Sequence, residues 1–289
     1  MYKFFKNIIL SIISFMIILS CSSNEDSVNR PMLLLHSIDI SIGKNRIPFY
    51  IKHKDSSMLN IEPDLLEIIY YKADTNKNHK VKEIKWRNNP IKGGMYVADM
   101  NFLSSGIWIV EIKYENIKSP LKSQLIVKSK TDALDIGEKA PIIQTKVIND
   151  KNLIETITSD PNPDPSLYQI SLDRALEKNI PILITLSTPG YCQSSTCGPQ
   201  TRVLSDLNNN NNFMDDQVQF IHIEIYDNPD EMKTSGDISI GIQSSQISEW
   251  GIKTEPWTFL IDNNGTIVER YEGFVSSEEL REDINNLLN

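Results

Sequence analysis

The chain has 289 residues, with 29 Lys and Arg against 38 Asp and Glu, so its formal net charge is −9 at pH 7. This length suits about two domains, and a composition of 40% hydrophobic and 23% charged residues is that of a folded globular protein. The negative charge argues against a nucleic-acid-binding protein, because phosphate recognition needs a basic surface. Three cysteines are too few for a disulfide-dense scaffold, so each one has to be placed individually.

The first 20 residues have the pattern of an export signal. Two lysines precede an apolar stretch at residues 8–19, which is shorter than the roughly 20 residues that span a bilayer as a helix. The sequence ILSC at residues 18–21 resembles the bacterial lipobox, in which the cysteine becomes the lipid-bearing first residue. We therefore expect a signal peptide at residues 1–20, lipidation of Cys21 and a polar tether at residues 21–30. The alternative is a plain secretory signal followed by an incidental cysteine.

This N-terminal region also predicts where the protein works. A lipid on Cys21 would hold it at a membrane of a bacterial cell envelope, outside the cytoplasm, on the periplasmic or the outer face. Disulfides persist in such compartments. We therefore expect an extracytoplasmic lipoprotein whose remaining cysteines can be oxidised.

Residues 31–130 have the pattern of an all-β domain. Seven short runs of strand-forming residues are separated by Asn, Gly, Pro, Asp and Ser. The runs are 33–42, 47–52, 65–71, 81–86, 95–102, 107–114 and 121–127. In the clearest run, Trp108, Val110 and Ile112 share one face of the strand. Short strands at this spacing predict an antiparallel sandwich with Trp86 or Trp108 in its core.

This pattern resembles the immunoglobulin-like domains that often stand between a lipid anchor and a working domain. The resemblance implies a spacer or a docking module. His36, His53 and His79 occur singly on different elements, and an isolated histidine of this kind is more commonly an ordinary residue than a metal ligand. We expect no metal site in this half of the chain.

Residues 131–289 alternate strands with helices after a linker. The strand-like runs are 180–187, 218–225, 256–262 and 266–271, and helices are expected within 166–179, from Pro199 onward, within 242–250 and after Ser276. The first two runs are largely apolar on both faces, which predicts inner strands of a covered sheet. Asn264 and Gly265 predict a hairpin turn between the last two strands.

Two cysteines follow the first of these strands. Cys192 and Cys197 have four residues between them. On a regular helix, residues five apart point about 140° away from each other, and their Cα atoms are farther apart than the roughly 7 Å that a disulfide tolerates. We therefore expect the helix to start near Pro199, a favoured first-turn residue. Residues 193–196 then have to form a turn that brings the sulfurs together.

The order strand, dithiol turn, helix, strand, helix, proline-started strand, hairpin, strand, helix resembles the thioredoxin-like superfamily over residues 139–289. The segments that carry the resemblance are 182–192, 197–199 and 250–256. It implies an α/β thioredoxin-like domain preceded by the all-β sandwich. It also implies a cis peptide before Pro256, where Glu255 and Pro256, together with Tyr191, contact the substrate. The ordinary alternative is a trans proline at the start of a strand.

The resemblance implies thiol–disulfide exchange, in which one thiolate attacks and a second thiol resolves the mixed disulfide. We assign Cys192 as the attacking thiol, because it directly follows the strand, and Cys197 as the resolving thiol. In a second alignment, Cys197 takes the place of the family's first cysteine and Gln200 that of its second. The implied partners are exported or cell-envelope proteins with thiols or disulfides, and no cofactor or resident metal is expected.

Two departures from the family pattern keep other hypotheses open. Many thioredoxins have a buried acid six residues before the first cysteine, where this chain has Leu186, and no acid occurs between Lys178 and Ser205. Glu255 would raise the pKa of a nearby thiol and oppose the helix dipole. The second hypothesis is therefore a non-catalytic binding module with a structural disulfide.

The third hypothesis is copper handling, since soft thiolates suit Cu(I). Copper chaperones with this fold need a histidine in the loop before the later strand, where this chain has Thr254. His222 is the one histidine in residues 131–289, and we expect it to be a packed core residue.

Overall fold

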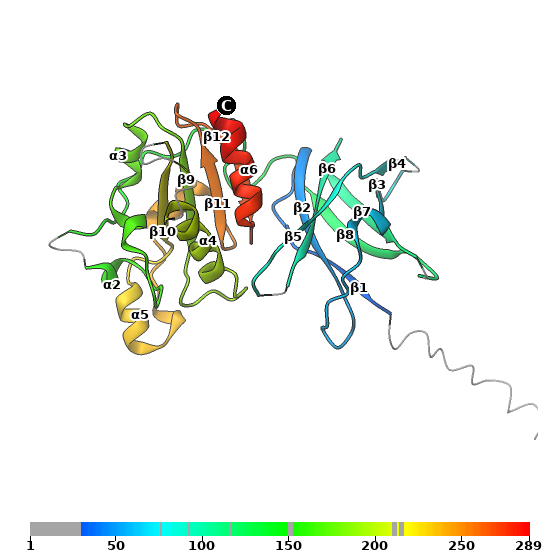
Figure 1. Ribbon diagram of the computed structural model, residues 1–289, viewed down its shortest axis with the longest axis horizontal. Coiled ribbons are helices and arrows are strands. Elements are labelled where there is room, and N and C mark those ends of the chain that lie inside the picture. Colours follow the sequence, from blue (N-terminus) through cyan, green and yellow to red (C-terminus); the bar gives the residue numbers. More distant parts are fainter. Residues whose placement is uncertain are drawn as a thin grey trace, which may run out of the picture.

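The computed structural model describes residues 30–75, 77–91, 93–115, 117–149, 153–209, 213 and 217–289. The predicted signal peptide, the lipidation site Cys21 and the tether up to residue 29 lie outside these residues. Figure 1 shows an all-β part and an α/β part side by side. Within the described residues, no helix is both long enough and apolar enough to cross a membrane.

The all-β part is a sandwich of two antiparallel four-stranded sheets. One sheet has the order β1-β2-β6-β5, formed by β1 (Met32–Leu35), β2 (Gly43–Lys52), β6 (Met95–Phe102) and β5 (Ile84–Arg87). The other has the order β4-β3-β7-β8, formed by β4 (Asn78–Lys80), β3 (Glu67–Lys72), β7 (Gly106–Lys113) and β8 (Leu121–Val127). A 3-10 turn, η2 (Pro63–Leu65), precedes β3. The predicted all-β fold is confirmed.

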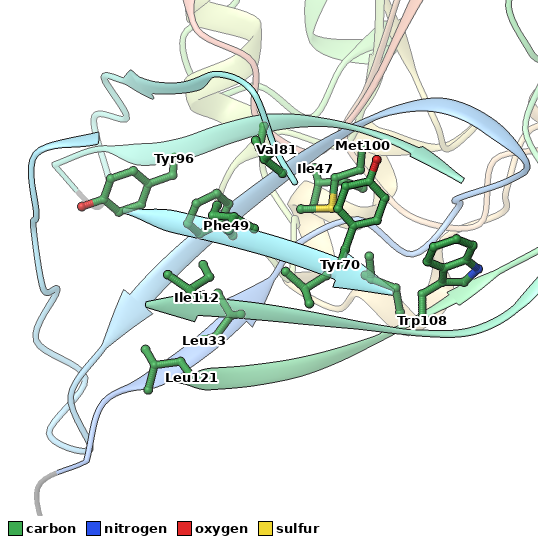
Figure 2. Packing of buried hydrophobic residues seen from close by; sticks show 14 of the residues in the cluster. Leu33, Ile47, Phe49, Tyr70, Val81, Tyr96, Met100, Trp108, Ile112 and Leu121 are labelled. Carbon is green, nitrogen blue, oxygen red and sulfur yellow. The ribbon is translucent and has the colours of Figure 1, made fainter. Parts of the chain in front are cut away.

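Side chains from both sheets fill the space between them (Figure 2). Trp108 is 2% exposed and packs edge-on against Phe102, with ring centroids 5.1 Å apart. Trp86 is only partly buried and lies against the edge of the cluster, on Tyr96. Of the two tryptophans proposed for the core, Trp108 is therefore the one that occupies it.

Two elements of the sandwich differ from the prediction. The strand predicted at 33–42 ends at Leu35, because the residues after it leave the sheet and contact the α/β part. The three residues of β4 all fall between the predicted runs 65–71 and 81–86, and they pair with Ile69, Tyr70 and Tyr71 of β3. The described sandwich consequently has eight strands rather than seven.

The α/β part is built on one mixed sheet with the order β10-β9-β11-β12. Its strands are β9 (Ile182–Ser187), β10 (Gln219–Glu224), β11 (Trp257–Ile261) and β12 (Ile267–Glu272). Its helices are α2 (Ile154–Ile157), α3 (Leu172–Leu176), α4 (Cys197–Asn209), α5 (Pro229–Ser235) and α6 (Ser277–Leu288), with 3-10 turns η3 (Pro165–Tyr168), η4 (Ile238–Ile240) and η5 (Ser245–Trp250). β9 runs parallel to β10 and antiparallel to β11.

β9 is the inner strand on which both core layers meet. All six of its residues are buried, as predicted. Ile184 belongs to one apolar cluster with Trp250, and Leu183 belongs to another with Leu204 of α4. β10 is predicted to be an inner strand as well, but it lies at the edge of the sheet. Its residues are buried all the same because η3 and α4 pack against it.

Two ion pairs join the two parts of the molecule, one buried and one with a half-exposed glutamate. Arg46 of β2 contacts Glu279 of α6 through two hydrogen bonds, of 2.6 and 2.8 Å. Both side chains are nearly enclosed, with 12% and 10% of their surface exposed. Arg87 of β5 makes a second two-point contact with Glu282 of the same helix, at 3.1 and 2.7 Å. Two-point contacts of this kind fix direction as well as distance, so α6 is held against the sandwich in one orientation.

Removal of the Arg46 side chain should weaken this junction. In Arg46→Met, the Glu279 carboxylate stays buried without its partner, so we expect a loss of about 3 kcal/mol in the free energy of unfolding. Urea denaturation followed by tryptophan fluorescence measures this loss. The matched control is Lys44→Met, because Lys44 and Asp99 are 74% and 57% exposed and such pairs contribute less than about 1 kcal/mol. Equal losses of stability in both variants would contradict the stabilising role of the buried Arg46–Glu279 pair.

Candidate functional site

Cys192 and Cys197 form a disulfide at the carboxyl end of β9 and the start of α4. The S–S distance is 2.08 Å and the Cα–Cα distance is 5.8 Å. Cys197 has 0% of its surface exposed, whereas Cys192 is partly exposed. A partner molecule can therefore reach only the sulfur of Cys192 without a structural change, which is the arrangement expected if Cys192 attacks and Cys197 resolves.

A tight turn brings the two sulfurs together. Ser195 adopts a φ of 60°, and its N–H donates to the Cys192 carbonyl at 3.2 Å. The N–H of Cys197 points at the Cys192 sulfur, 3.3 Å away. α4 begins at Cys197 and not near Pro199 as predicted. Pro199 still falls in the first turn, where its missing N–H is not needed for a bond within the helix.

The loop at residues 251–256, here called the proline loop, leads into β11 and lies beside the disulfide. The peptide between Glu255 and Pro256 is cis, as predicted. Ser194 connects the loop to the dithiol turn: its Oγ is 3.1 Å from the Cys192 sulfur and donates to the Glu255 carbonyl at 3.3 Å. The Glu255 carboxylate turns toward the end of β9, where it accepts a hydrogen bond of 2.6 Å from the N–H of Thr188.

Glu255 places a carboxylate beside both sulfurs. Its carboxylate oxygen and the sulfurs of Cys192 and Cys197 lie within 4.8 Å of one another. Burial raises the pKa of Glu255, and the hydrogen bond from Thr188 partly offsets this effect. A carboxyl group with a raised pKa can exchange a proton with a neighbouring thiol. The same three groups could hold a soft metal ion only after reduction, because a closed disulfide offers no thiolate.

The sequence reasoning missed a second acid, Glu224 at the end of β10. It is 7% exposed, and burial raises its pKa to about 7. Its carboxylate accepts hydrogen bonds of 2.7 Å from both the N–H and the hydroxyl of Ser159. The Ser159 hydroxyl in turn accepts a bond of 3.1 Å from the N–H of Gly190, two residues before Cys192. A buried acid is thus present on the strand next to β9, and hydrogen bonds through Ser159 connect it to the backbone of the dithiol turn.

A signal for Glu224 was present in the sequence. It is the one charged residue in the apolar run 218–225, and a charge in such a run is rarely left buried without a partner. Leu186 stands where many thioredoxins have their buried acid, and its side chain is fully buried in the apolar core.

His222 is a core residue, as predicted. It is 2% exposed, and its two ring nitrogens lie 2.8 Å from the hydroxyls of Tyr168 and Ser187. Burial lowers the pKa of His222 to about 3, so the ring is neutral near pH 7. With both nitrogens occupied, His222 does not offer a metal ligand to the dithiol.

Tyr191 occupies a different place from the other predicted substrate residues. Its hydroxyl donates to the carbonyl of Met232 in α5 at 2.7 Å, so it ties the dithiol turn to that helix. On the other side of Cys192 lies a hollow of about 300 Å³ that also reaches Arg202 of α4. The same hollow is lined by Asp160, so it brings a carboxylate as well as a guanidinium to the side of Cys192.

Glu224→Gln should change how stability depends on pH. The pKa of Glu224 is raised from 4.5 to about 7 by folding, so its ionisation destabilises the native state increasingly as pH rises through this interval. We expect the variant to gain roughly 2 to 3 kcal/mol relative to the natural protein between about pH 5 and about pH 8. The comparison with the natural protein is needed because His222 has the opposite sign: its contribution is lost as pH falls below 6.5. Urea denaturation at both pH values measures the difference in unfolding free energy between the variant and the natural protein. The same difference at both pH values would contradict a raised pKa of Glu224.

The chain is similar to known proteins in both of its parts. Residues 168–287 match the family model described as a thioredoxin-like domain. No curated protein matches the chain. Similar solved structures include two from Chlorobium tepidum. The first is assigned as thiol:disulfide interchange protein DsbE; it is 17% identical, and the match covers 54% of this chain and 100% of that chain with a TM-score of 0.35. The second is a thioredoxin family protein; it is 15% identical, and the match covers 48% of this chain and 99% of that chain with a TM-score of 0.29. The sandwich matches the filamin domain of Lin-41 at 10% identity, covering 35% and 95% with a TM-score of 0.24. Residues 168–287 of this chain are therefore a thioredoxin-like domain, and the Cys192–Cys197 disulfide lies at the start of its helix α4.

Proposed function

We propose that the protein is a thiol–disulfide oxidoreductase that exchanges the Cys192–Cys197 disulfide with cysteines of exported or cell-envelope proteins. The observation that carries the proposal is the asymmetry of the pair: Cys192 is partly exposed opposite a cis-proline loop, and Cys197 is fully buried behind it. The export signal and the lipobox-like motif at Cys21 support a place of action at the membrane, outside the cytoplasm.

The exchange proceeds in two balanced steps. In the reduced protein, the Cys192 thiolate attacks a substrate disulfide; its S–S bond breaks and one substrate sulfur leaves as a thiolate. Cys197 then loses its proton and attacks the Cys192 sulfur, which closes the internal disulfide and releases the second substrate thiolate. Two electrons pass from the protein to the substrate. The reverse sequence oxidises a substrate dithiol, and the reduction potential decides the direction.

The geometry favours the thiolate of Cys192. Its sulfur receives the N–H of Cys197 at 3.3 Å, in the first turn of α4. A hydrogen bond to the charged form and the positive end of a helix both lower the pKa of a thiol. The carboxylate of Glu255 acts in the other direction when it is ionised.

Proton transfer to and from Cys197 needs a local acid, because this sulfur is closed off from water. Glu255 is the carboxylate within reach, and its raised pKa keeps part of the population protonated above the usual range for glutamate. Glu224, hydrogen-bonded to Ser159, is a second buried carboxyl, and the charge of Glu255 adds to burial in raising its pKa.

The first test is the reduction potential of the disulfide. In glutathione redox buffers we expect a two-electron couple between about −120 and −270 mV, the range of working oxidoreductases. Cys192→Ser and Cys197→Ser should abolish the couple. Cys197→Ser should also accumulate a mixed disulfide with a small disulfide reagent, whereas Cys192→Ser should not, because its remaining sulfur is buried.

A bridge that stays closed below about −300 mV would overturn this proposal and identify a binding module with a structural disulfide. A pair that never closes in any buffer would also overturn it, and would favour the soft-metal role of Cys192, Cys197 and Glu255.

Neutralisation of Glu255 should lower the pKa of the Cys192 thiol. In reduced Glu255→Gln, the amide can still accept the N–H of Thr188, but the negative charge beside the sulfur is gone. We expect the midpoint of the pH profile for iodoacetamide labelling to fall by about one unit. Glu249→Gln is the matched control because Glu249 is an exposed acid on η5. The same midpoint in Glu255→Gln as in the natural protein would remove Glu255 from the electrostatics of the site.

A further inference from the structure

A groove of about 480 Å³ lies between the two parts of the molecule, next to the disulfide. The sandwich contributes Leu35 at the end of β1 and His36 and Ile38 of the segment that follows it. The α/β part contributes the proline loop, and the dithiol turn contributes Ser194. The groove therefore begins at the residue that contacts the Cys192 sulfur and continues onto the sandwich.

One carboxylate ties the two walls together. Glu272, at the end of β12, accepts the N–H groups of Ile38 and Asp39 through one oxygen, at 2.8 and 3.0 Å. Its other oxygen accepts the hydroxyl of Thr254 at 2.7 Å, immediately before Glu255 in the proline loop. Glu272 thus connects the backbone at Ile38 to the loop before Pro256, and the adjacent Asp39 adds a buried ion pair of 2.7 Å with Arg270 of β12.

The segment after β1 also packs closely on the α/β part at the same point. Gly273 has a φ of +77°, and a Cβ on it would lie 3.2 Å from Cδ2 of His36. A larger residue would be strained in that backbone conformation and would press on the histidine ring. The segment after β1 is therefore seated on the α/β part rather than free to move away from it.

The lining of the groove suits an apolar ligand with a polypeptide backbone. Ile38 is 62% exposed and lines the groove together with Ile225, Tyr226 and Ile252. Within the described residues, the N–H of Glu255 donates to no other residue, which leaves a backbone donor for an added strand.

The charges in the groove select against acidic ligands. Two carboxylates, those of Glu255 and Glu272, line it, and its one lysine, Lys253, is paired with Asp132 at 3.0 Å. A segment with Asp or Glu beside its cysteine would meet like charge on this surface.

We propose that the sandwich forms part of the substrate site, and that the groove binds an extended polypeptide segment with apolar, non-acidic residues beside its reactive cysteine. This inference rests on the proposed thiol–disulfide exchange. It gives the sandwich a role in substrate selection, since Ile38 would contact the substrate residues that flank the substrate's reactive cysteine.

The test is the single-turnover reduction of peptide disulfides by the reduced full chain. Three probes are used, each a pair of identical short peptides joined by one disulfide, with Val and Leu, Ser and Gly, or Asp beside the cysteine. Glutathione disulfide reports the dithiol chemistry without a groove ligand. For the natural protein, we expect the Val/Leu peptide to react about tenfold faster than the Ser/Gly peptide, and the Asp peptide to be the slowest.

Ile38→Ser should lower the ratio of the Val/Leu peptide rate to the glutathione disulfide rate about fivefold. Ile38→Leu should retain that ratio. The matched control is Ile126→Ser on β8, because Ile126 is 70% exposed and does not line the groove. Equal melting temperatures of the two serine variants show that both are folded.

The outcomes separate the two proposals. If Ile38→Ser keeps the same ratio as Ile126→Ser while glutathione disulfide is still reduced, the role of the sandwich is wrong and the oxidoreductase stands. If neither the peptides nor glutathione disulfide is reduced, the proposed function itself fails.

Discussion

The burial of β9 on both faces is the constraint on which the site depends. Its six residues are all buried, and its four apolar residues alternate between the two apolar layers of the α/β part, so the point where the strand ends is fixed. The chain leaves the sheet at Ser187, and within ten residues it has to turn and start α4. Cys192 and Cys197 lie on the two sides of that turn, which is why their sulfurs meet at a defined place rather than in a mobile loop.

Charge around the dithiol is balanced rather than uniform. The first turn of α4 and the N–H of Cys197 stabilise negative charge on the Cys192 sulfur, whereas Glu255 disfavours it. The acids also differ in how they reach the site. Glu255 arrives with the proline loop and Glu224 with β10, so a chain without an acid on β9 still has carboxyl groups with raised pKa near its sulfurs. Buried acids can therefore be supplied from positions that a motif search does not inspect.

Local patterns in the sequence predicted most of the elements and the dithiol, because strand alternation, turn residues and cysteine spacing are encoded within a few neighbours. The cis peptide before Pro256 followed from the resemblance to thioredoxin-like proteins. The edge position of β10 did not follow, since helices bury an edge strand as completely as an inner one. Contacts such as Arg46–Glu279 join residues 233 positions apart, and nothing local in either segment indicates its partner.

The junction between the two parts has consequences for how the sandwich is understood. A spacer needs only a flexible connection to the domain that it carries, and a buried two-point ion pair such as Arg46–Glu279 is costly to form for that purpose. Here Arg46 and Arg87 hold α6 on one side, and Glu272 holds the segment after β1 on the other, next to the proline loop. Contacts on two sides prevent rotation about either one. A sandwich held in this way keeps Ile38 at a constant position relative to Cys192, which a substrate-selecting wall requires and a spacer does not.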